Sequence, residues 1–280
     1  MPRATLSRRH SSSLRTASVR PLFEGLTLPL MCAPMSYASS VPLAAACCDA
    51  GVIGGWQGGS STGDDLFLGY LERLLKASAA PPIVNIPARW GSDPAYANRL
   101  DLLARFRVPL VLSSVGDPSA LVERVHGWGG RLIHDVTTMR HATKAIAVGV
   151  DGLMLTCAGA GGHAGLLTPM AFVPAVRRVY DGLVIVAGGI ADARGMAAAL
   201  MLGGDLACMG TRFIATPESG VKGGHRSMIS AAEMDDIIMS AAMNGVPAHW
   251  IRQSIESVGL DPASLPAKRT AMPEGVRPWR

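Results

Sequence analysis

The order of apolar and polar residues divides most of the chain into short and long segments. Eight short apolar runs are bounded by Gly, Pro or Asp, and segments with helical periodicity separate them. This alternation is the signature of parallel βα units. We therefore predict buried strands at residues 28–34, 51–55, 82–86, 108–113, 131–136, 151–157, 183–187 and 205–209.

The segments between these runs carry the end signals of helices. Asp192 can cap an Ala-rich stretch, and Pro169 suits a first helical turn. The predicted helices are residues 41–50, 65–77, 95–104, 118–127, 139–148, 169–180 and 192–202. Eight strands with helices between them predict an α/β fold, a (β/α)8 TIM barrel, over residues 23–216. An open doubly wound sheet also alternates in this way, but no further alternation follows the eighth run.

After Thr216 the pattern changes and predicts helices without strands. Residues 230–242 and 248–258 are the candidate helices, and a Pro-rich tail follows them. We expect residues 217–280 to form a helical extension that packs on the barrel or forms an oligomer contact, as in a homodimer.

Charge is concentrated at the start of the chain. The formal net charge is +5, and residues 1–20 hold five arginines (Arg3, Arg8, Arg9, Arg15 and Arg20) and no acid. The rest is formally neutral, which argues against a nucleic-acid partner. Residues 1–22 are predicted to be a disordered basic leader, with a transit peptide or a vector-derived scar as alternatives.

Membrane and metal signals are missing from the sequence. No apolar run approaches the ~18 residues of a membrane span. The five cysteines lack C-x-x-C spacing, and no H-x-x-x-H motif or carboxylate cluster occurs, so we expect neither a disulfide framework nor a metal site. Free cysteines fit a reducing compartment, and we expect a cytoplasmic protein with no membrane partner.

The residues after each strand of such a barrel face one rim, where functional groups gather. The strand ends place these candidates there: Ala33, Pro34 and Met35 after the first run, Asn85 after the third, His134 and Thr137 after the fifth, residues 159–165 after the sixth, Gly188 and Gly189 after the seventh, and Gly210 and Thr211 after the eighth.

Two of these loops have the composition of a phosphate site. Gly188-Gly189 and Gly210-Thr211-Arg212 follow neighbouring strands, and glycine lets backbone N–H groups approach an anion, with a helix N-terminus nearby. The strands that they follow, seventh and eighth in order, build the phosphate site of many barrels. The alternative is that the glycines only make tight turns.

The loop at residues 159–165 is the most specific feature. Its Gly159 to Ala164 segment matches G-x-G-x-x-A, but Leu166-Leu167-Thr168-Pro169 delays the helix that a dinucleotide fingerprint requires. His163 is flanked by glycines, so a planar ligand can approach it, and histidine suits proton transfer or pairing with an anion. A structural hydrogen bond to the rim is the alternative role.

Two further side chains have two interpretations each. His134 can contact a cofactor, or it can be buried and bonded to a backbone carbonyl. Asn85 can bind a flavin ring or ribityl chain, or it can form a turn in Asn85-Ile86-Pro87.

Four segments together resemble the nitronate monooxygenase family, formerly called 2-nitropropane dioxygenases. They are Ala33-Pro34-Met35, then Ala158-Gly159-Ala160-Gly161-Gly162-His163-Ala164-Gly165, then Ala187-Gly188-Gly189-Ile190-Ala191-Asp192, and Met209-Gly210-Thr211-Arg212-Phe213-Ile214-Ala215-Thr216. The resemblance runs from about residue 28 to about residue 265. It implies a bound FMN whose phosphate lies on Gly188, Gly189, Gly210 and Thr211. The flavin would further contact Ala33, Pro34, Met35, Asn85, His134, Ala158, Gly161 and Gly162.

The resemblance also implies the reaction. Family members convert an alkyl nitronate and O2 to a carbonyl compound and nitrite, with the histidine of the G-G-H motif, here His163, as the catalytic residue. This chain departs from typical members in two ways: it is shorter between the second and fifth strands, and it has His134 where several relatives have Lys.

Two alternatives stay open. An NAD(P)H-dependent enoyl-acyl-carrier-protein or quinone reductase has the same barrel and G-G-H motif. A non-redox barrel would bind a phosphate-bearing ligand instead.

Overall fold

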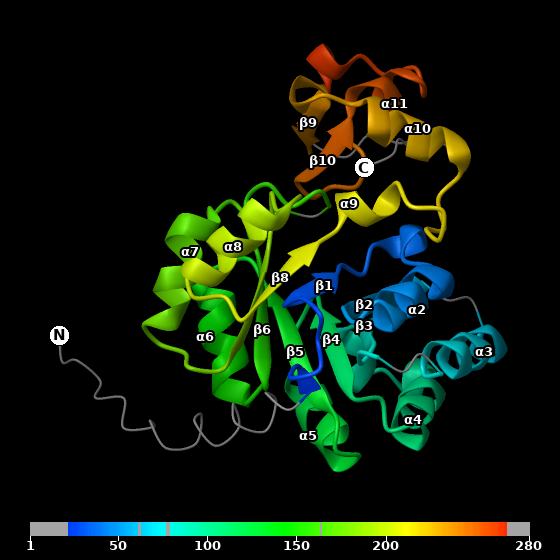
Figure 1. Cartoon of the computed structure of the whole chain (residues 1–280), viewed down its shortest axis with the longest axis vertical. Helices are drawn as coiled ribbons and strands as arrows, with labels where there is room; N and C mark the ends of the chain where they lie inside the picture. Colours follow the sequence, from blue (N-terminus) through cyan, green and yellow to red (C-terminus); the bar gives the residue numbers. More distant parts are fainter. Residues whose placement is uncertain (1–21, 61–62, 77–78, 163, 268–280) are drawn as a thin grey trace.

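The computed structural model describes residues 22–60, 63–76, 79–162 and 164–267. Eight parallel strands close into a barrel in chain order, which confirms the predicted (β/α)8 barrel (Figure 1). They are β1 (Leu30–Cys32), β2 (Ile53–Gln57), β3 (Ile83–Pro87), β4 (Leu110–Ser114), β5 (Arg131–Val136), β6 (Gly152–Thr156), β7 (Leu183–Ala187) and β8 (Leu206–Met209). β1 pairs with both β2 and β8, and this pairing closes the ring.

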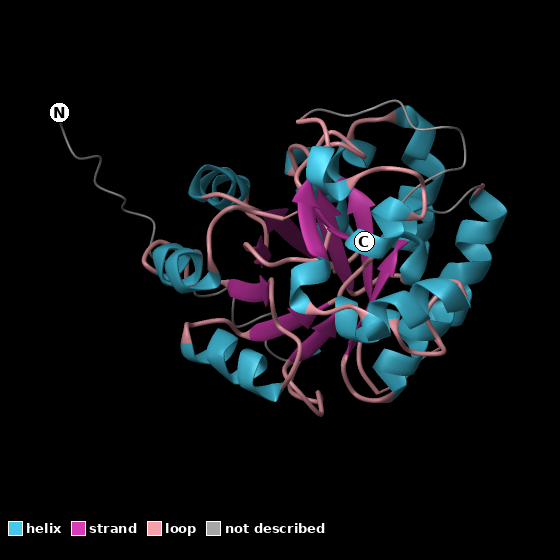
Figure 2. Ribbon diagram, turned by 90° about the horizontal axis from the view of Figure 1, so that it is seen from above, coloured by secondary structure: helices cyan, strands magenta, loops and turns pink. Residues whose placement is uncertain are grey.

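Seven helices form the outer layer, and Figure 2 shows them surrounding the strands. They are α2 (Val41–Asp49), α3 (Asp64–Leu74), α4 (Ala97–Arg105), α5 (Ser119–Gly127), α6 (Met139–Val148), α7 (Pro169–Arg177) and α8 (Ala193–Met201). Capping side chains fix several of their starts. The Ser40 side chain accepts from the Leu43 N–H at α2, and Asp192 caps α8 as predicted.

The strands separate two apolar cores, because successive side chains of a strand point to opposite sides. On β5, Ile133 belongs to the core inside the barrel, while Leu132 and Val136 belong to the core under the helices. The same alternation turns His134 toward the helices and Asp135 toward the barrel interior.

The C-terminal part differs from the prediction. The helices expected at residues 230–242 and 248–258 are wrong: α10 (Gly223–Ala231) is followed by an antiparallel pair, β9 (Ile237–Ser240) and β10 (Ala248–Ile251), and then by the short α11 (Arg252–Glu256). Apolar β-branched residues in β9 favour a strand. Gly245 at φ +84° stands in the connection between the two strands, which would interrupt a helix there.

This part of the chain has a small core of its own. It is formed by Ala242, Met243, Ala248, Trp250 and Ile255. The Trp250 indole N–H donates to the Ser240 carbonyl and ties the two strands together. We call the segment from α10 to α11 the cap. Figure 1 shows it beyond the end of the barrel where α9 (Thr211–Ile214) lies.

The division of the chain into leader, barrel and extension stays a prediction, and residues 1–21 of the leader lie outside the described residues. Within the described ranges, no helix combines the length and apolar character needed to cross a bilayer. All five cysteines are buried and free.

Candidate active site

Three glycine-containing loops meet at the end of the barrel where the strands terminate, which we call the mouth. The Gly189 N–H donates to the Gly159 carbonyl at 3.0 Å, which joins the loops after β7 and β6. A Cβ on Gly161 would lie 2.9 Å from Thr211 Oγ1, so the loops after β6 and β8 are also in contact. The structure therefore brings together the loops that the sequence singled out.

The glycines of these loops leave the backbone open to a ligand. Gly189 has φ +70°, and no atom would lie within 4 Å of a Cβ placed on Gly189 or on Gly162. The neighbouring Gly188 and Ala158 lie deeper, since a Cβ on Gly188 would be 3.0 Å from the Ala158 carbonyl oxygen. The open backbone is thus at Gly162 and Gly189.

The polar groups available to an anion differ between the loops after β7 and β8. Asp192 accepts from the N–H groups of Arg194 and Gly195, so the first turn of α8 is occupied by its own cap. Thr211 and Arg212, in contrast, are exposed at the start of α9. The loop after β8 therefore offers the Thr211 hydroxyl beside Gly161 and an exposed arginine at the next position.

The loop after β1 adjoins the same place. Ser39 fixes this loop, because its hydroxyl donates to the Ala33 carbonyl at 3.0 Å and accepts from the Met35 N–H at 2.5 Å. The Met35 sulfur would lie 3.1 Å from a Cβ on Gly210. Pro34 packs against β2, since its nitrogen would be 2.8 Å from a Cβ on Gly55. Ala33, Pro34 and Met35 thus border the mouth, as predicted.

Asn85 lies within β3, not in a turn, and points into the barrel. Its side-chain amide donates to the Leu112 carbonyl at 3.0 Å and to Ser114 Oγ at 3.3 Å. Both donors are engaged, so the side chain has only its oxygen to offer a ligand. Gln57, at the end of the adjacent β2, has a buried Oε1 without a hydrogen-bond partner among the described residues.

Asp135 is a mouth residue that the sequence reasoning missed. Its carboxylate accepts from the Thr156 hydroxyl at 2.5 Å. Burial raises the pKa of this carboxyl to about 6, although the Thr156 hydrogen bond opposes the rise. Strand alternation was the available signal, because an acid two positions after Ile133 shares its inward direction.

His134 is not brought to the mouth. It lies on the helix side of β5 and is 5% exposed, with its Nδ1 2.8 Å from Ser113 Oγ. Burial lowers the pKa of its imidazole to about 4. The environment is that of a neutral histidine bonded inside the protein wall, the second of the two interpretations.

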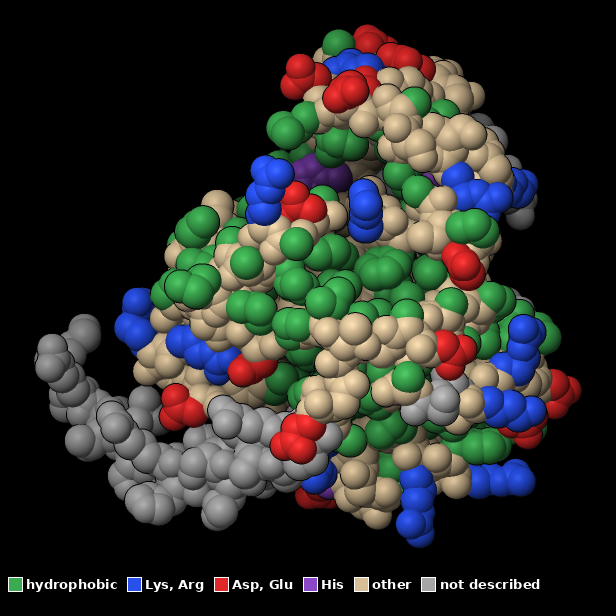
Figure 3. Space-filling model, viewed as in Figure 1, with side chains coloured by type: hydrophobic (Ala, Val, Ile, Leu, Met, Phe, Trp, Pro, Cys, Tyr) green, Lys and Arg blue, Asp and Glu red, His purple; other side chains and the backbone are tan. Residues whose placement is uncertain are grey.

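His163 lies outside the described residues, but both sides of its loop are fixed by the cap. The His249 Nδ1–H donates to the Ala160 carbonyl at 2.6 Å, and the Ala164 N–H donates to the Pro247 carbonyl at 3.3 Å. Figure 3 shows a recess between the cap and the barrel, with histidine at its edge. The sequence did not indicate this contact, since the segment was expected to be helical.

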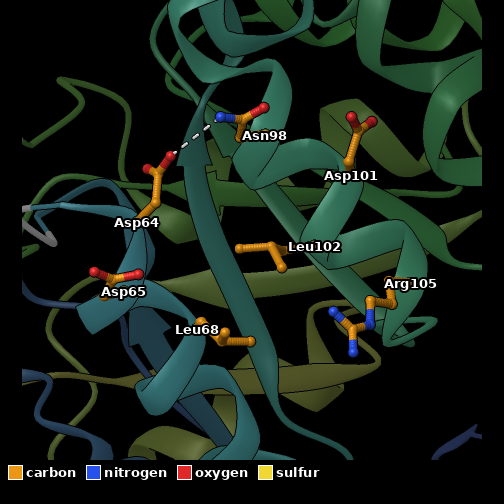
Figure 4. Close-up of a pocket in the computed structure, with 7 residues that line it drawn as sticks. All are labelled: Asp64, Asp65, Leu68, Asn98, Asp101, Leu102 and Arg105. Atoms are coloured by element: carbon orange, nitrogen blue, oxygen red, sulfur yellow. Dashed lines mark hydrogen bonds between the residues drawn. The ribbon is translucent and has the colours of Figure 1, made fainter.

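A separate surface hollow of about 510 Å³ lies between α3 and α4 (Figure 4). It is lined by Asp64, Asp65, Leu68, Asn98, Asp101, Leu102 and Arg105. Asp64 already pairs with Arg99, whose guanidinium also lies over the Phe67, Trp90 and Tyr96 rings. In the described ranges no cluster of three or more His, Cys, Asp or Glu side chains forms a metal site. The polar groups of the mouth are therefore the better candidate site.

Comparisons with known proteins show which proteins this chain resembles. A nitronate monooxygenase from Paraburkholderia phytofirmans is 29% identical and aligns with 86% of this chain and 78% of its own. A second relative, from Mycobacterium tuberculosis, is 29% identical, and the match covers 84% of this chain and 66% of the relative's length. Its name is (3aS,4S,5R,7aS)-5-hydroxy-7a-methyl-1-oxo-octahydro-1H-indene-4-carboxyl-CoA dehydrogenase.

Solved structures share the fold. A mutant of FabK from Thermotoga maritima superposes with a TM-score of 0.75 and 29% identity, covering 91% of this chain and 87% of its own. A family model described as nitronate monooxygenase matches residues 21–273. That match covers most of the chain and all eight strands of the barrel, so the protein belongs to the nitronate monooxygenase family.

Proposed function

We propose that this protein binds FMN at the barrel mouth and oxidises alkyl nitronates with O2 to a carbonyl compound and nitrite. The observation that carries the proposal is the open glycine backbone at Gly162 and Gly189, where the loops after β6, β7 and β8 meet. A planar ring with a phosphate tail needs such a surface, because side chains would keep it away from the backbone.

The polar groups of the mouth fit a flavin. Gln57 has an unpartnered buried acceptor, and Asn85 has only an acceptor left, so both suit an N–H donor of the flavin ring. Thr211 and Arg212 would hold the phosphate, since a hydroxyl and a guanidinium are strong partners of phosphate oxygens. The open backbone at Gly189 would let the phosphate come near.

When bound, FMN supplies the chemistry of accepting electrons from the nitronate and passing them to O2. The protein's part is binding, orientation and proton transfer. His163, from the G-G-H motif, would take the proton from the carbon of a neutral nitroalkane onto a ring nitrogen. His249 and Pro247 would hold the loop that carries it.

The test is an absorption spectrum of the purified protein followed by anaerobic additions. We expect a flavin spectrum that an alkyl nitronate alone bleaches, and nitrite when air is admitted. A colourless protein that cannot be reconstituted with FMN would contradict the proposal and favour a non-redox barrel for a phosphate-bearing ligand.

A second candidate is an NAD(P)H-dependent flavin reductase acting on an acyl thioester or a quinone. The likeness to a carboxyl-CoA dehydrogenase, whose name describes redox chemistry on an acyl thioester, favours it. The same experiment separates the two candidates, because NADH or NADPH would then bleach the flavin and nitronate would not.

A further inference from the structure

Asp135 is an unusual residue for a strand of the barrel wall. Arg131 and Asp135 are the only Lys, Arg, Asp or Glu residues in the eight strands, and Arg131 stands at the first position of β5, far from the mouth. Aspartate is depleted in strands, and enclosing a carboxylate among apolar groups costs free energy. Packing alone gives no reason for an acid at this position.

The surroundings of Asp135 form a polar arc on the inner face of four consecutive strands. Asn85 of β3 donates to Ser114 of β4, and Thr156 of β6 donates to Asp135 of β5. Below the arc, Ile133, Met154 and Ile185 belong to the apolar core inside the barrel. The arc is therefore the polar floor of the mouth, and Asp135 is its acid.

No cation balances this acid in the described part of the chain, whose salt bridges join other groups. The titratable side chains beside it are the Cys157 and Cys208 thiols, at the end of β6 and on β8. Burial raises the pKa of both thiols to about 12, with Asp135 as the second cause, so both stay neutral. Asp135 as a whole residue is half-buried.

We propose that Asp135 faces the flavin from the barrel floor and takes up one proton from solvent when the flavin binds. This inference rests on the proposed flavin binding. In the step a solvent proton forms an O–H bond on the carboxylate, and no electrons are transferred.

The physical reason is loss of water. A ring bound across the mouth would cover Asp135, which is half-buried as a residue and whose carboxyl already has a pKa of about 6, and further desolvation favours the neutral form. A neutral carboxyl can then donate a hydrogen bond as well as accept one from Thr156. Asp135 would thereby hold a proton beside the reacting atoms, on a different element from His163.

The first test measures proton uptake by the wild-type protein. Apoprotein is mixed with riboflavin in weak buffer between pH 6 and pH 8, and the pH change is recorded. Riboflavin is the probe because the phosphate of FMN has its own pKa near 6. We expect up to about one proton per flavin bound, and a dissociation constant that rises by up to about tenfold per pH unit in this range.

Two variants sharpen the test. Asp135→Asn should bind riboflavin with no uptake and a flat pH profile. Thr156→Val removes the hydrogen bond that lowers the pKa of Asp135, so the onset of the pH dependence should move to higher pH. Ser113→Ala, which removes a strand hydroxyl on the helix side of β4, is the control and should leave the profile unchanged.

The outcomes are distinct. Flavin binding without proton uptake by the wild type, or an unchanged profile in Asp135→Asn, overturns the role of Asp135 and leaves the proposed function standing. Failure of both FMN and riboflavin to bind at any pH overturns the proposed function and this inference together. Because uptake is measured on the wild type, the test decides the role of Asp135 even where a variant does not fold.

Discussion

Two neighbouring residues of β5 meet opposite surroundings. His134 points to the helix layer, where Ser113 lies beside its ring and burial keeps the imidazole neutral, with a pKa of about 4. Asp135 points into the barrel, where burial moves the pKa of its carboxyl the other way, to about 6. Desolvation favours the uncharged form of each group, so it lowers one pKa and raises the other.

The two residues differ in their access to a ligand at the barrel mouth. His134 is buried between strand and helix, while Asp135 is half-buried near the end of β5 that leads to the mouth. Two ionisable groups one residue apart thus face opposite sides of the barrel wall, and only the inner one can meet a ligand. Substitutions on the two sides of the barrel wall can test this division between the sealed wall and the open mouth.

The largest effect is expected at His163, with His134 as its comparison. His163→Ala should retain FMN but lose about 10²–10⁴-fold in turnover, because general acid–base groups usually contribute that much. His134→Gln, on the sealed side, should keep its turnover. Steady-state nitrite formation and the flavin spectrum of both variants provide the measurement. Equal losses in the two variants would remove the distinction between them.

Much of the fold was predictable, because periodicity reports which residues face apolar surroundings. β5, α6 and β7 have the bounds that the sequence predicts. The cap was mispredicted, because its short strands are stabilised by pairing with each other, as in the Trp250 bond to Ser240, and this pairing leaves little local signal.

The site was predictable only in part. Glycine loops can be recognised locally, since several glycines stand close together in the sequence. Asp135 was not singled out, although strand alternation places it on the same face as Ile133, because only the residues after the strands were taken as candidates, with His134 at the end of its strand. The contact of His249 with Ala160 joins residues 89 positions apart, and no local pattern reports it.

The second prediction concerns stability against pH. Between about pH 4 and pH 6 folded Asp135 binds more protons than the unfolded chain, so its contribution to stability falls as pH rises. Folded His134 binds fewer protons than the unfolded chain between about pH 4 and pH 6.5, so its contribution rises with pH. In the wild type the two contributions to the pH dependence of stability oppose each other.

Replacing either residue should therefore leave only the other residue's contribution to the pH dependence of stability. From pH 6 to pH 4, Asp135→Asn should lose, and His134→Gln gain, on the order of 2 kcal/mol in unfolding free energy relative to the wild type. Urea denaturation of the apoproteins at several pH values measures this, and the double variant should recover the wild-type slope. Parallel curves for the two single variants would contradict the two pKa shifts.

The third prediction tests the open glycine backbone. Gly189→Val should weaken FMN binding by about tenfold or more, equivalent to about 1.4 kcal/mol, because a side chain would enter the ligand's space. Gly129→Val is a matched control. Gly129 has φ +84°, open space around it and an exposed position before β5, at the opposite rim.

Both glycine variants should suffer a similar strain from a side chain at positive φ, so their losses of thermal stability should be comparable. Only Gly189→Val should lose flavin affinity in a fluorescence titration. Full flavin occupancy of that variant would place the phosphate or the ring elsewhere.

The smallest effect is expected at the cap. His249→Ala removes the hydrogen bond to the Ala160 carbonyl, which is worth about 1 kcal/mol, and should lower turnover by about fivefold by loosening the loop that carries His163. His249→Asn keeps an N–H donor and should recover most of the activity.

Hydrogen exchange at the Ala164 amide, which is bonded to the Pro247 carbonyl, reports the opening of the loop directly and should become faster in His249→Ala alone. Unchanged exchange with reduced turnover would mean that His249 acts on the substrate and not through the loop.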